Sequence, residues 1–266
     1  MPVIESDLLD AIETGLFLIP ELPGRLEHLA IPGLLGRVAE VPHPLANMVG
    51  GARLETGERA ETTIRQVREL FAERGAPFGW VTGPSDTPAG LPARLQTAGL
   101  TKVVQMAGMA LTDLERPIRA NAAVRVREMR DEDVAAANEV LATGFDFPLA
   151  LAELLMEAMR AGTPRLGGRQ YLAFVEERED PVAVSLSVRV PGTSILMLGG
   201  AATLPEYRGR GIYTSLVARR VADGRAEGCE AAIIQAVRTT SAPICAHLGF
   251  KELGALDQWI GMPPTG

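Results

Sequence analysis

The loop Arg208-Gly209-Arg210-Gly211 has the residue types that suit the binding of an anion. It joins an apolar run at 194–204, which is typical of a strand, to an amphipathic helix. The first N–H groups of a helix lack internal partners, and the positive end of the helix dipole lies there. Glycines leave this backbone uncovered and tolerate positive φ. The loop therefore predicts a pyrophosphate cradle, although on the glycines alone a solvated surface turn is an equally good interpretation.

The spacing of the loop residues narrows the choice of anion. A dinucleotide-binding G-x-G-x-x-G fingerprint fails because Thr214 stands at its third glycine, and a nucleoside-triphosphate loop fails because it needs a lysine. The pattern that fits is R-x-x-G-x-[G/A], with Arg208, Gly211 and Tyr213. Together with ATLPEY before it and TTSAPICAHLGF after it, this loop resembles the acyl-CoA loop of the GNAT acetyltransferase superfamily. The resemblance covers residues 124–262.

The resemblance implies an N-acyltransferase that moves an acetyl group from acetyl-CoA to an amine, with a small molecule as the default acceptor. The implied site is a V-shaped gap between parallel strands near Thr203 and Ile234, with a backbone N–H near Ala202 facing the oxyanion. The residues that would bind the cofactor are Ala201, Ala202, Thr203, Arg208, Gly209, Arg210, Gly211, Ile212, Tyr213, Thr214 and Ser241. Residues that would meet the acceptor are Phe145, Asp146 and Phe147, which fit a hydrophobic corner under a loop equally well.

Two residues depart from the family pattern. Tyr213 stands where Gly or Ala is usual, so its side chain must point away from the phosphates or stack against the cofactor. Cys245 replaces the tyrosine that acts as general acid in many members, and we expect it to be a packed residue at the edge of the core. No catalytic residue is therefore assigned. A non-catalytic acyl-CoA-binding module is the alternative function, and a pure interaction protein is a third, which the Arg/Gly loop argues against.

Three local predictions concern the elements around this loop. The helix after it places Ile212, Leu216, Val217 and Val221 on one face and Arg219, Arg220 and Asp223 on the other. Gly199-Gly200 inside a strand predicts a bulge that frees backbone groups for the cofactor, with a plain bend as the alternative. Ser241 is expected to cap the last helix, with Pro243 in its first turn.

An internal repeat predicts two tandem domains of the GNAT type, so that the fold class is α/β (α+β) with mainly antiparallel sheets flanked by helices. The proposed units are 1–116, a degenerate copy without a CoA loop, and 123–266, the acyl-CoA-binding copy. Gly75 and Gly99 correspond to Gly228 and Gly249. In the first copy the start of the helix carries Glu55, Glu58 and Glu61. These carboxylates favour the helix but would repel a pyrophosphate.

Composition excludes several other functions. The net charge of −7 disfavours nucleic acid as a partner, and no apolar run approaches the length of a membrane span. The two cysteines provide no disulfide framework, which favours a reducing, cytoplasmic setting. The three histidines show no metal-ligand spacing, so no metal is expected, and the acidic start does not look like a signal peptide. A homodimer stays open.

The remaining periodicity predicts the elements that position these residues. Helices are expected at 6–15, 61–75, 91–99, 131–141 and 149–162, besides those flanking the loop. Strands are expected at 34–41, 47–54, 78–83, 103–111 and 124–130, then as a three-strand meander over 171–204, and at 230–237 and 256–262.

Overall fold

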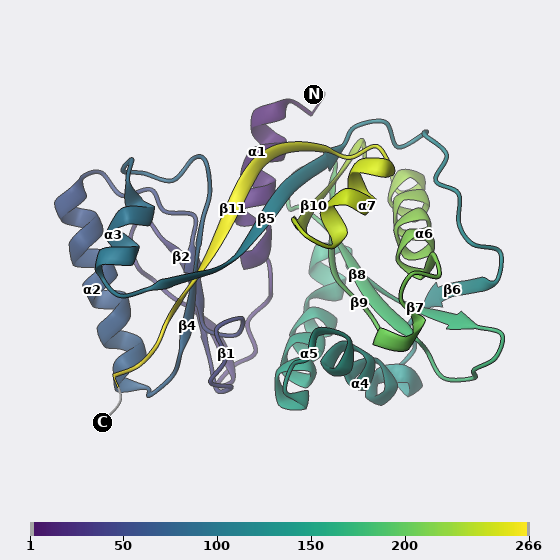
Figure 1. The fold of residues 1–266 in the computed structure, drawn as a ribbon, viewed down its shortest axis with the longest axis horizontal. Coiled ribbons are helices and arrows are strands. Elements are labelled where there is room, and N and C mark those ends of the chain that lie inside the picture. The colour runs from purple at the N-terminus through teal and green to yellow at the C-terminus, as the bar shows by residue number, and fades with distance from the viewer. Residues whose placement is uncertain (1–2, 265–266) are drawn as a thin grey trace.

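One eleven-stranded sheet runs through the computed structural model, which describes residues 3–264 (Figure 1). The strand order is β1-β2-β3-β4-β11-β5-β10-β9-β8-β7-β6. Two neighbouring pairs, β3/β4 and β9/β10, are parallel, and the other neighbours are antiparallel. The predicted fold class, a mixed α/β fold with a mainly antiparallel sheet flanked by helices, is therefore confirmed.

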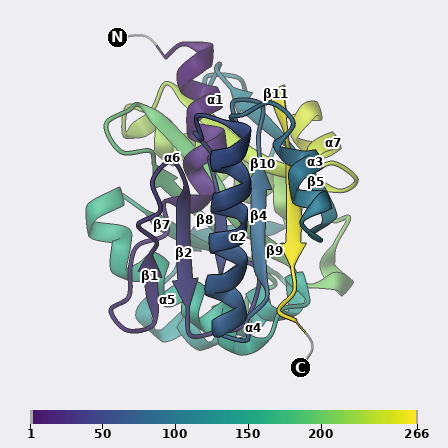
Figure 2. The ribbon, with the colours of Figure 1, turned by 90° about the vertical axis from the view of Figure 1, so that its left-hand side faces the viewer.

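The first half of the chain opens with a helix and then forms five strands and two further α-helices. Its elements are α1 (Glu5–Thr14), the 3₁₀ turn η1 (Gly15–Phe17), β1 (Leu26–His28), β2 (Leu35–Ala39), β3 (Met48–Gly50), α2 (Gly57–Glu73), β4 (Phe78–Thr82), α3 (Leu91–Thr97) and β5 (Thr101–Leu111). Figure 2 shows α2 in front of this end of the sheet, running along the direction of β2 and β4.

The second half contributes the other six strands and four α-helices. Its elements are β6 (Val124–Glu128), η2 (Asp131–Asp133), α4 (Val134–Phe145), α5 (Leu149–Leu166), β7 (Arg169–Val175), β8 (Ala183–Arg189), β9 (Ile195–Thr203), η3 (Pro205–Tyr207), α6 (Ile212–Ala226), β10 (Ala231–Val237), α7 (Ser241–His247) and β11 (Lys251–Gly261).

Helix α5 is longer than the sequence predicts, because Gly162 does not end it. A Cβ at Gly162 would lie 2.0 Å from Pro20 Cγ, so this glycine is a point of close contact with the N-terminal half. The helix continues to Leu166 and ends at Gly167, whose φ of +55° is the usual left-handed cap.

The two halves repeat the same series of elements and exchange their last strands. The first half has β1-β2-β3-α2-β4-α3-β5, and the second has β7-β8-β9-α6-β10-α7-β11. Strand β5 pairs with β10, and β11 pairs with β4, while β5 and β11 pair with each other. Figure 1 shows these two long strands crossing between the halves. Each half therefore completes the sheet of the other, and the boundaries at 116 and 123 stay a prediction. Residues 1–2 and 265–266 of the predicted units lie outside the described part.

Helices cover both faces of the sheet in the second half. Val217 and Val221 of α6 and Cys245 of α7 pack on one face, against a core that contains Ile234. Ile12 of α1 packs on the opposite face, in a core that contains Ile233. Helices α4 and α5 form a further core with the ends of β7, β8 and β9. In the described chain no helix is long and apolar enough to cross a membrane.

Candidate functional site

Strands β9 and β10 begin as parallel neighbours and then part. Their paired register runs only from Ile195↔Ala231 to Met197↔Ile233. Beyond it β9 continues to Thr203 beside β8, while β10 continues to Val237 beside β5. The backbone edges of the two strands therefore diverge from Leu198 and Ile234 onward, which is where the sequence predicts a V-shaped gap.

The predicted bulge at Gly199-Gly200 is confirmed. Val184 of β8 pairs with Ala202 of β9, and Leu186 pairs with Gly199. A step of two residues along β8 therefore faces a step of three residues along β9, which leaves one extra residue in β9. Gly200 has a φ of +54°, and a Cβ there would lie 2.8 Å from Leu186 Cδ2, so a side chain is both strained and crowded out. The extra residue shifts the alternation of side chains, so that Ala202 faces the core under α4 and α5.

The start of α6 leaves its first backbone N–H groups without an internal acceptor. Gly209 and Gly211 have φ of +75° and +73°, and Gly211 is the N-cap, with no side-chain cap bond. The N–H of Ser215 is the first intrahelical donor and bonds to Gly211 O at 3.0 Å, so the N–H groups of Ile212, Tyr213 and Thr214 come before it and have no acceptor within the helix. This arrangement fits an anionic group without any side chain having to move aside.

Asn121, from the segment that joins the two halves, holds this loop in shape. Its side-chain amide donates to Arg210 O at 2.9 Å, and its own N–H donates to Ser215 Oγ at 3.0 Å. Ser215 Oγ in turn donates to Gly211 O at 3.1 Å. The cradle is therefore formed before any ligand arrives, and sequence reasoning missed Asn121 because no motif links it to a loop so far along the chain.

The two arginines of the loop turn toward protein groups. Arg208 donates to Thr203 O at 3.2 Å and to Gly144 O at 2.7 Å, and so ties the end of α4 to the end of β9. Arg210 pairs with Glu177 at 2.5 Å, and its guanidinium carbon lies 5.4 Å from the ring centre of Tyr207. In this arrangement the backbone N–H groups, rather than the guanidinium groups, form the cradle.

Tyr213 points away from the cradle toward α7, which is one of the two orientations that the sequence allows. Its Oη lies 3.3 Å from Sγ of Cys245. Cys245 is fully buried in the core between α6, α7 and the sheet, so the prediction of a packed residue is confirmed. Burial raises the pKa of the Tyr213 hydroxyl and of the Cys245 thiol, and both groups therefore stay neutral near pH 7.

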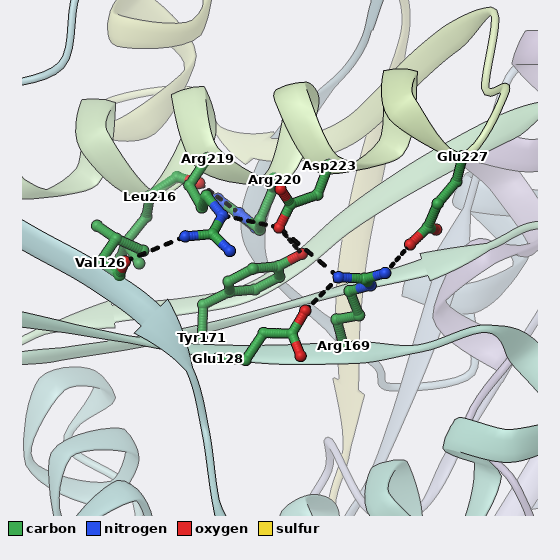
Figure 3. Close-up of polar contacts among 9 residues, drawn as sticks. All are labelled: Val126, Glu128, Arg169, Tyr171, Leu216, Arg219, Arg220, Asp223 and Glu227. Atoms are coloured by element: carbon green, nitrogen blue, oxygen red, sulfur yellow. Dashed lines mark hydrogen bonds and ion pairs between the residues drawn. The ribbon is translucent and has the colours of Figure 1, made fainter.

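Arg220 is buried, and its assignment to the exposed face of α6 was wrong. It has no exposed surface, because it follows Leu216 by four residues and Val217 by three and so shares their face. Its Nε donates to Leu216 O at 3.1 Å (Figure 3), and its Nη1 donates to Leu186 O at 3.0 Å and Gly199 O at 3.4 Å. Its Nη2 has no partner among the described atoms. Burial lowers the pKa of its guanidinium.

A polar network fixes the outer side of α6 on the sheet (Figure 3). Asp223 accepts from Tyr171 Oη at 3.0 Å and from Arg219 Nε at 2.8 Å, and Arg219 also donates to Val126 O at 3.3 Å. Arg169 lies between Glu128 and Glu227 and pairs with both. Tyr171 is buried, and its hydrogen bond to Asp223 anchors the helix that carries the cradle.

The predicted acceptor residues lie at the end of α4. A Cβ on Gly144 would lie 2.8 Å from Ala202 Cβ and 3.2 Å from Thr203 N, so this corner abuts the end of β9. Phe145 is 41% exposed and stacks on Phe147 with ring centres 5.0 Å apart. Asp146 caps the helix with a φ of +58°. The corner is thus placed beside the gap, with Phe145 partly open to solvent.

Ser241 is the first residue of α7, but it is not the N-cap. Thr240 occupies that position, without a side-chain cap bond. The prediction of a Ser241 cap was therefore wrong by one residue. Over the described residues, His, Cys, Asp and Glu side chains form no group of three or more that could hold a metal ion.

Residues 125–252 match the family model described as acetyltransferase (GNAT) domain. This segment contains the loop, the bulge and the diverging strands described above. Over these residues the chain is therefore similar to the acetyltransferase domain of the GNAT family. No curated protein is significantly similar to the chain in sequence.

Solved structures of the same fold extend over both halves. A GCN5-related N-acetyltransferase from Sphaerobacter thermophilus has a TM-score of 0.67 at 14% identity, covering 100% of this chain and 95% of that one. A GCN5-related N-acetyltransferase from Kribbella flavida has a TM-score of 0.66 at 16% identity, covering 91% of each chain. A tandem GNAT protein from the clavulanic acid biosynthesis pathway has a TM-score of 0.61 at 12% identity, covering 98% and 96%. At these identities the likeness defines the fold alone.

Proposed function

We propose that the protein is an N-acyltransferase that moves an acetyl group from acetyl-CoA to the amine of a small molecule. The observation that carries the proposal is the uncapped glycine start of α6, which lies beside the diverging ends of β9 and β10. It occurs within the segment that matches the GNAT domain. A preformed backbone cradle beside an open strand edge suits a ligand with a pyrophosphate and an extended amide arm.

The residues present fit acetyl-CoA in three parts. The N–H groups of residues 209–214 would hold the pyrophosphate. The edge of β9 at Ala201, Ala202 and Thr203 would pair with the amide arm, because β10 has left that edge. When bound, acetyl-CoA supplies an activated thioester. A backbone N–H near Ala202 would stabilise the charge on its carbonyl oxygen, and positioning of the amine would supply much of the acceleration.

The acceptor would approach from the corner formed by Phe145, Asp146 and Phe147. Arg208 joins this corner to the strand end through Gly144 O and Thr203 O, so cofactor loop and acceptor corner form one connected surface. The aromatic stack provides apolar surface, and Asp146 provides a carboxylate for an ammonium group. The residues 1–116 form, in our proposal, a unit without a CoA site of its own.

The second candidate function is a non-catalytic acyl-CoA-binding module. The observation that favours it is the burial of Cys245. Burial raises the pKa of this thiol and so makes it a weaker acid than an exposed cysteine. In this case the cradle would bind acyl-CoA, but no thioester would be consumed.

Calorimetry and a turnover assay together test these functions. We expect acetyl-CoA to bind with one site per chain, and thiol release to occur with at least one member of a panel of small-molecule amines. Binding without thiol release across the panel would favour the module. Failure of acetyl-CoA and CoA to bind at all would reject both candidates.

A further inference from the structure

A groove between α2 and α3 opens on the outer surface of the first half. Its volume is about 410 Å³, and Ile64, Ala93 and Ala98 form its apolar lining. Ile64 is only 3% exposed and belongs to the core of that half, so it lies at the bottom of the groove. Figure 1 shows α2 and α3 at the opposite end of the molecule from α6. The groove is therefore separate from the cradle and from the gap between β9 and β10.

Three arginines line this groove, Arg65 and Arg68 from α2 and Arg94 from α3. Glu61 is the one carboxylate among the lining residues, and it lies 3.7 Å from Arg94 with most of its side chain exposed. Exposed pairs of this kind hold each other only weakly. Within the described chain, neither Arg65 nor Arg68 forms an ion pair with a carboxylate. The groove thus has an excess of positive charge, on a protein whose net charge is −7.

The second half shows that the shared architecture does not need arginines at these places. Equivalent positions follow from counting back from the paired left-handed glycines that come after the helices. Each arginine of the groove then corresponds to an apolar residue of the second half: Arg65 to Ala218, Arg68 to Val221, and Arg94 to Ile244. Val221 is buried, whereas Arg68 is exposed. The same place is therefore covered in the second half and open in the first.

The segment 112–121, which joins the two halves, covers this place in the second half. Glu115 forms an ion pair at 2.7 Å with the last turn of α6, and Asn121 bonds to the loop before the first turn. The segment therefore passes along the whole of α6 on its way to β6 (Figure 1). Its Leu114 and Ile118 pack against the core between α6 and α7. A non-helical segment with apolar and acidic side chains thus already lies beside these helices.

We propose that the groove between α2 and α3 binds a non-helical acidic segment of a partner protein, with an apolar side chain over Ile64 and carboxylates toward the three arginines. The segment that covers α6 is the precedent for the shape of this occupant, and the charge of the groove decides its sign. Arginine suits the role because its planar guanidinium binds a carboxylate through two parallel hydrogen bonds. The net charge of −7 disfavours nucleic acid as the occupant. Because the groove lies away from the cradle, its occupancy does not depend on the proposed function.

The probe is a synthetic peptide based on the segment that covers α6. The native sequence TDLERPIRAN has as many arginines as carboxylates, and the probe TDLEEPIEAN replaces both arginines with glutamate. With blocked ends and a fluorescent label, the probe should bind the full-length protein with a Kd below about 100 μM at low salt, and more weakly as salt is raised. The native sequence should bind at least about tenfold more weakly. TDSEEPSEAN, which lacks both large apolar side chains, should also bind at least about tenfold more weakly.

Two matched double variants locate the binding. Arg65→Ala with Arg68→Val gives α2 the residue types that α6 has at these positions, and should weaken probe binding by at least about tenfold. Arg59→Ala with Arg74→Ala removes the same charge from the same helix outside the groove, and should leave the affinity within about threefold of wild type. All four arginines are exposed, so both variants should fold. Acetyl-CoA affinity should be unchanged in both.

Three results would overturn this assignment of the groove. The first is equal loss of probe affinity in the two double variants, because charge alone would then explain the binding. The second is failure of the probe to bind wild type at about 1 mM, the limit of a weak complex. The third is a wild-type dimer, seen by sedimentation, that the groove variant abolishes, because the occupant would then be a second copy of this chain. Failure of wild type to bind acetyl-CoA would instead overturn the proposed function and leave the groove untouched.

Discussion

The N-termini of α2 and α6 occupy equivalent places in the two halves, but only the N-terminus of α2 is capped by a side chain. Helix α2 is capped by Thr56, whose side chain accepts from Arg59 N at 3.1 Å, and Glu58 lies in its first turn. Helix α6 has Gly211 at the same end, with no side-chain cap and no acidic residue in the first turn. The first helix satisfies its own N–H groups and dipole, whereas the second leaves both for a ligand.

The strand gaps beside these helices differ in the same sense. After β3, the chain at Ala52 and Leu54 is bridged to Thr87, through Thr87 N to Ala52 O at 3.0 Å and Leu54 N to Thr87 O at 3.1 Å. The corresponding edge of β9 has no such bridge to β10 beyond Met197. The gap between the two parallel strands is thus bridged by backbone hydrogen bonds in the first half and left unbridged in the second half. The buried Arg220 lies in the second half, beside the unbridged gap.

The largest effect should come from separating the two halves at residue 116. Without residues 117–266, β4 loses β11, and β5 loses both β10 and β11. We expect residues 1–116 and 117–266, produced separately, to lack a cooperative thermal transition, and co-production to restore a stable complex. Cooperative melting of residues 1–116 alone would show that the exchanged strands are dispensable and that the copies are independent domains.

The exchange of β5 and β11 between the two halves could not be predicted from the sequence. Hydrophobic periodicity located the longer elements, because they show their own period, and the glycine pairs revealed the repeat. The three-residue strand β1 was not predicted, because it is too short to show one. Nothing in the pattern of β5 or β11 specifies which half supplies the neighbour, because both neighbours bury similar apolar faces. The register is set by the packing of the whole sheet.

Arg220 illustrates the same limit within the site. Its charge suggested the solvent face, although its spacing from Leu216 and Val217 places it on the buried face. The loop glycines and the bulge could be predicted because a special backbone conformation demands a special residue. The Tyr213–Cys245 contact could not, because it joins two helices whose distance no local pattern determines.

A second large effect is expected from Gly211→Glu. This substitution would place a carboxylate at the N-terminus of α6, as Glu58 does at the N-terminus of α2. The change adds a negative charge and a side chain at the cradle, and acetyl-CoA binding should become undetectable by calorimetry, a loss of at least about a hundredfold. The fold should survive, since the position is exposed and the nearest atom to an added Cβ is Asn121 Cβ at 3.5 Å.

Gly75→Glu is the matched control for this loss. Gly75 is also exposed and left-handed, at φ +59°, and has open space around it, so both variants carry a similar backbone strain of about 1–2 kcal/mol. Only the Gly211 variant should lose affinity. Equal affinity of the two variants for acetyl-CoA would contradict the assignment of this loop as the pyrophosphate cradle.

A smaller effect concerns stability and pH in the closed copy. Burial raises the pKa of Asp86 to about 6, despite a hydrogen bond from Gly83 N and the nearby Arg53, and Glu13 adds negative charge beside it. The native state thus binds the proton more tightly than the unfolded chain does. The stabilisation is complete below about pH 4 and is lost as the pH rises through about 6.

Asp86→Asn should remove this dependence. Its free energy of unfolding, measured by urea titration, should exceed that of wild type at pH 7 by at most about 3 kcal/mol and should match it near pH 4. Asp180→Asn, at an exposed position of the other half, should follow wild type across the range. A wild-type stability that is flat between pH 4 and 7, relative to Asp86→Asn, would contradict the buried protonated carboxyl.

The smallest effect is expected from Cys245→Ala, which replaces the thiol beside Tyr213 with an apolar residue. The other copy is already apolar at the equivalent position, Leu95, four residues before Gly99 as Cys245 is before Gly249. A thiol of ordinary acidity, with a pKa of about 8.5, gains little by giving a proton to another alkyl thiolate, and burial makes this thiol a still weaker acid. We expect kcat to fall by less than roughly tenfold, well below the 10²- to 10⁴-fold of a general acid. The Tyr213 hydroxyl loses a neighbour at 3.3 Å but not its own proton.

Cys229→Ala, at the other buried cysteine, controls for the small loss of packing. A fall beyond about a hundredfold with acetyl-CoA affinity intact would make the thiol itself the catalytic group.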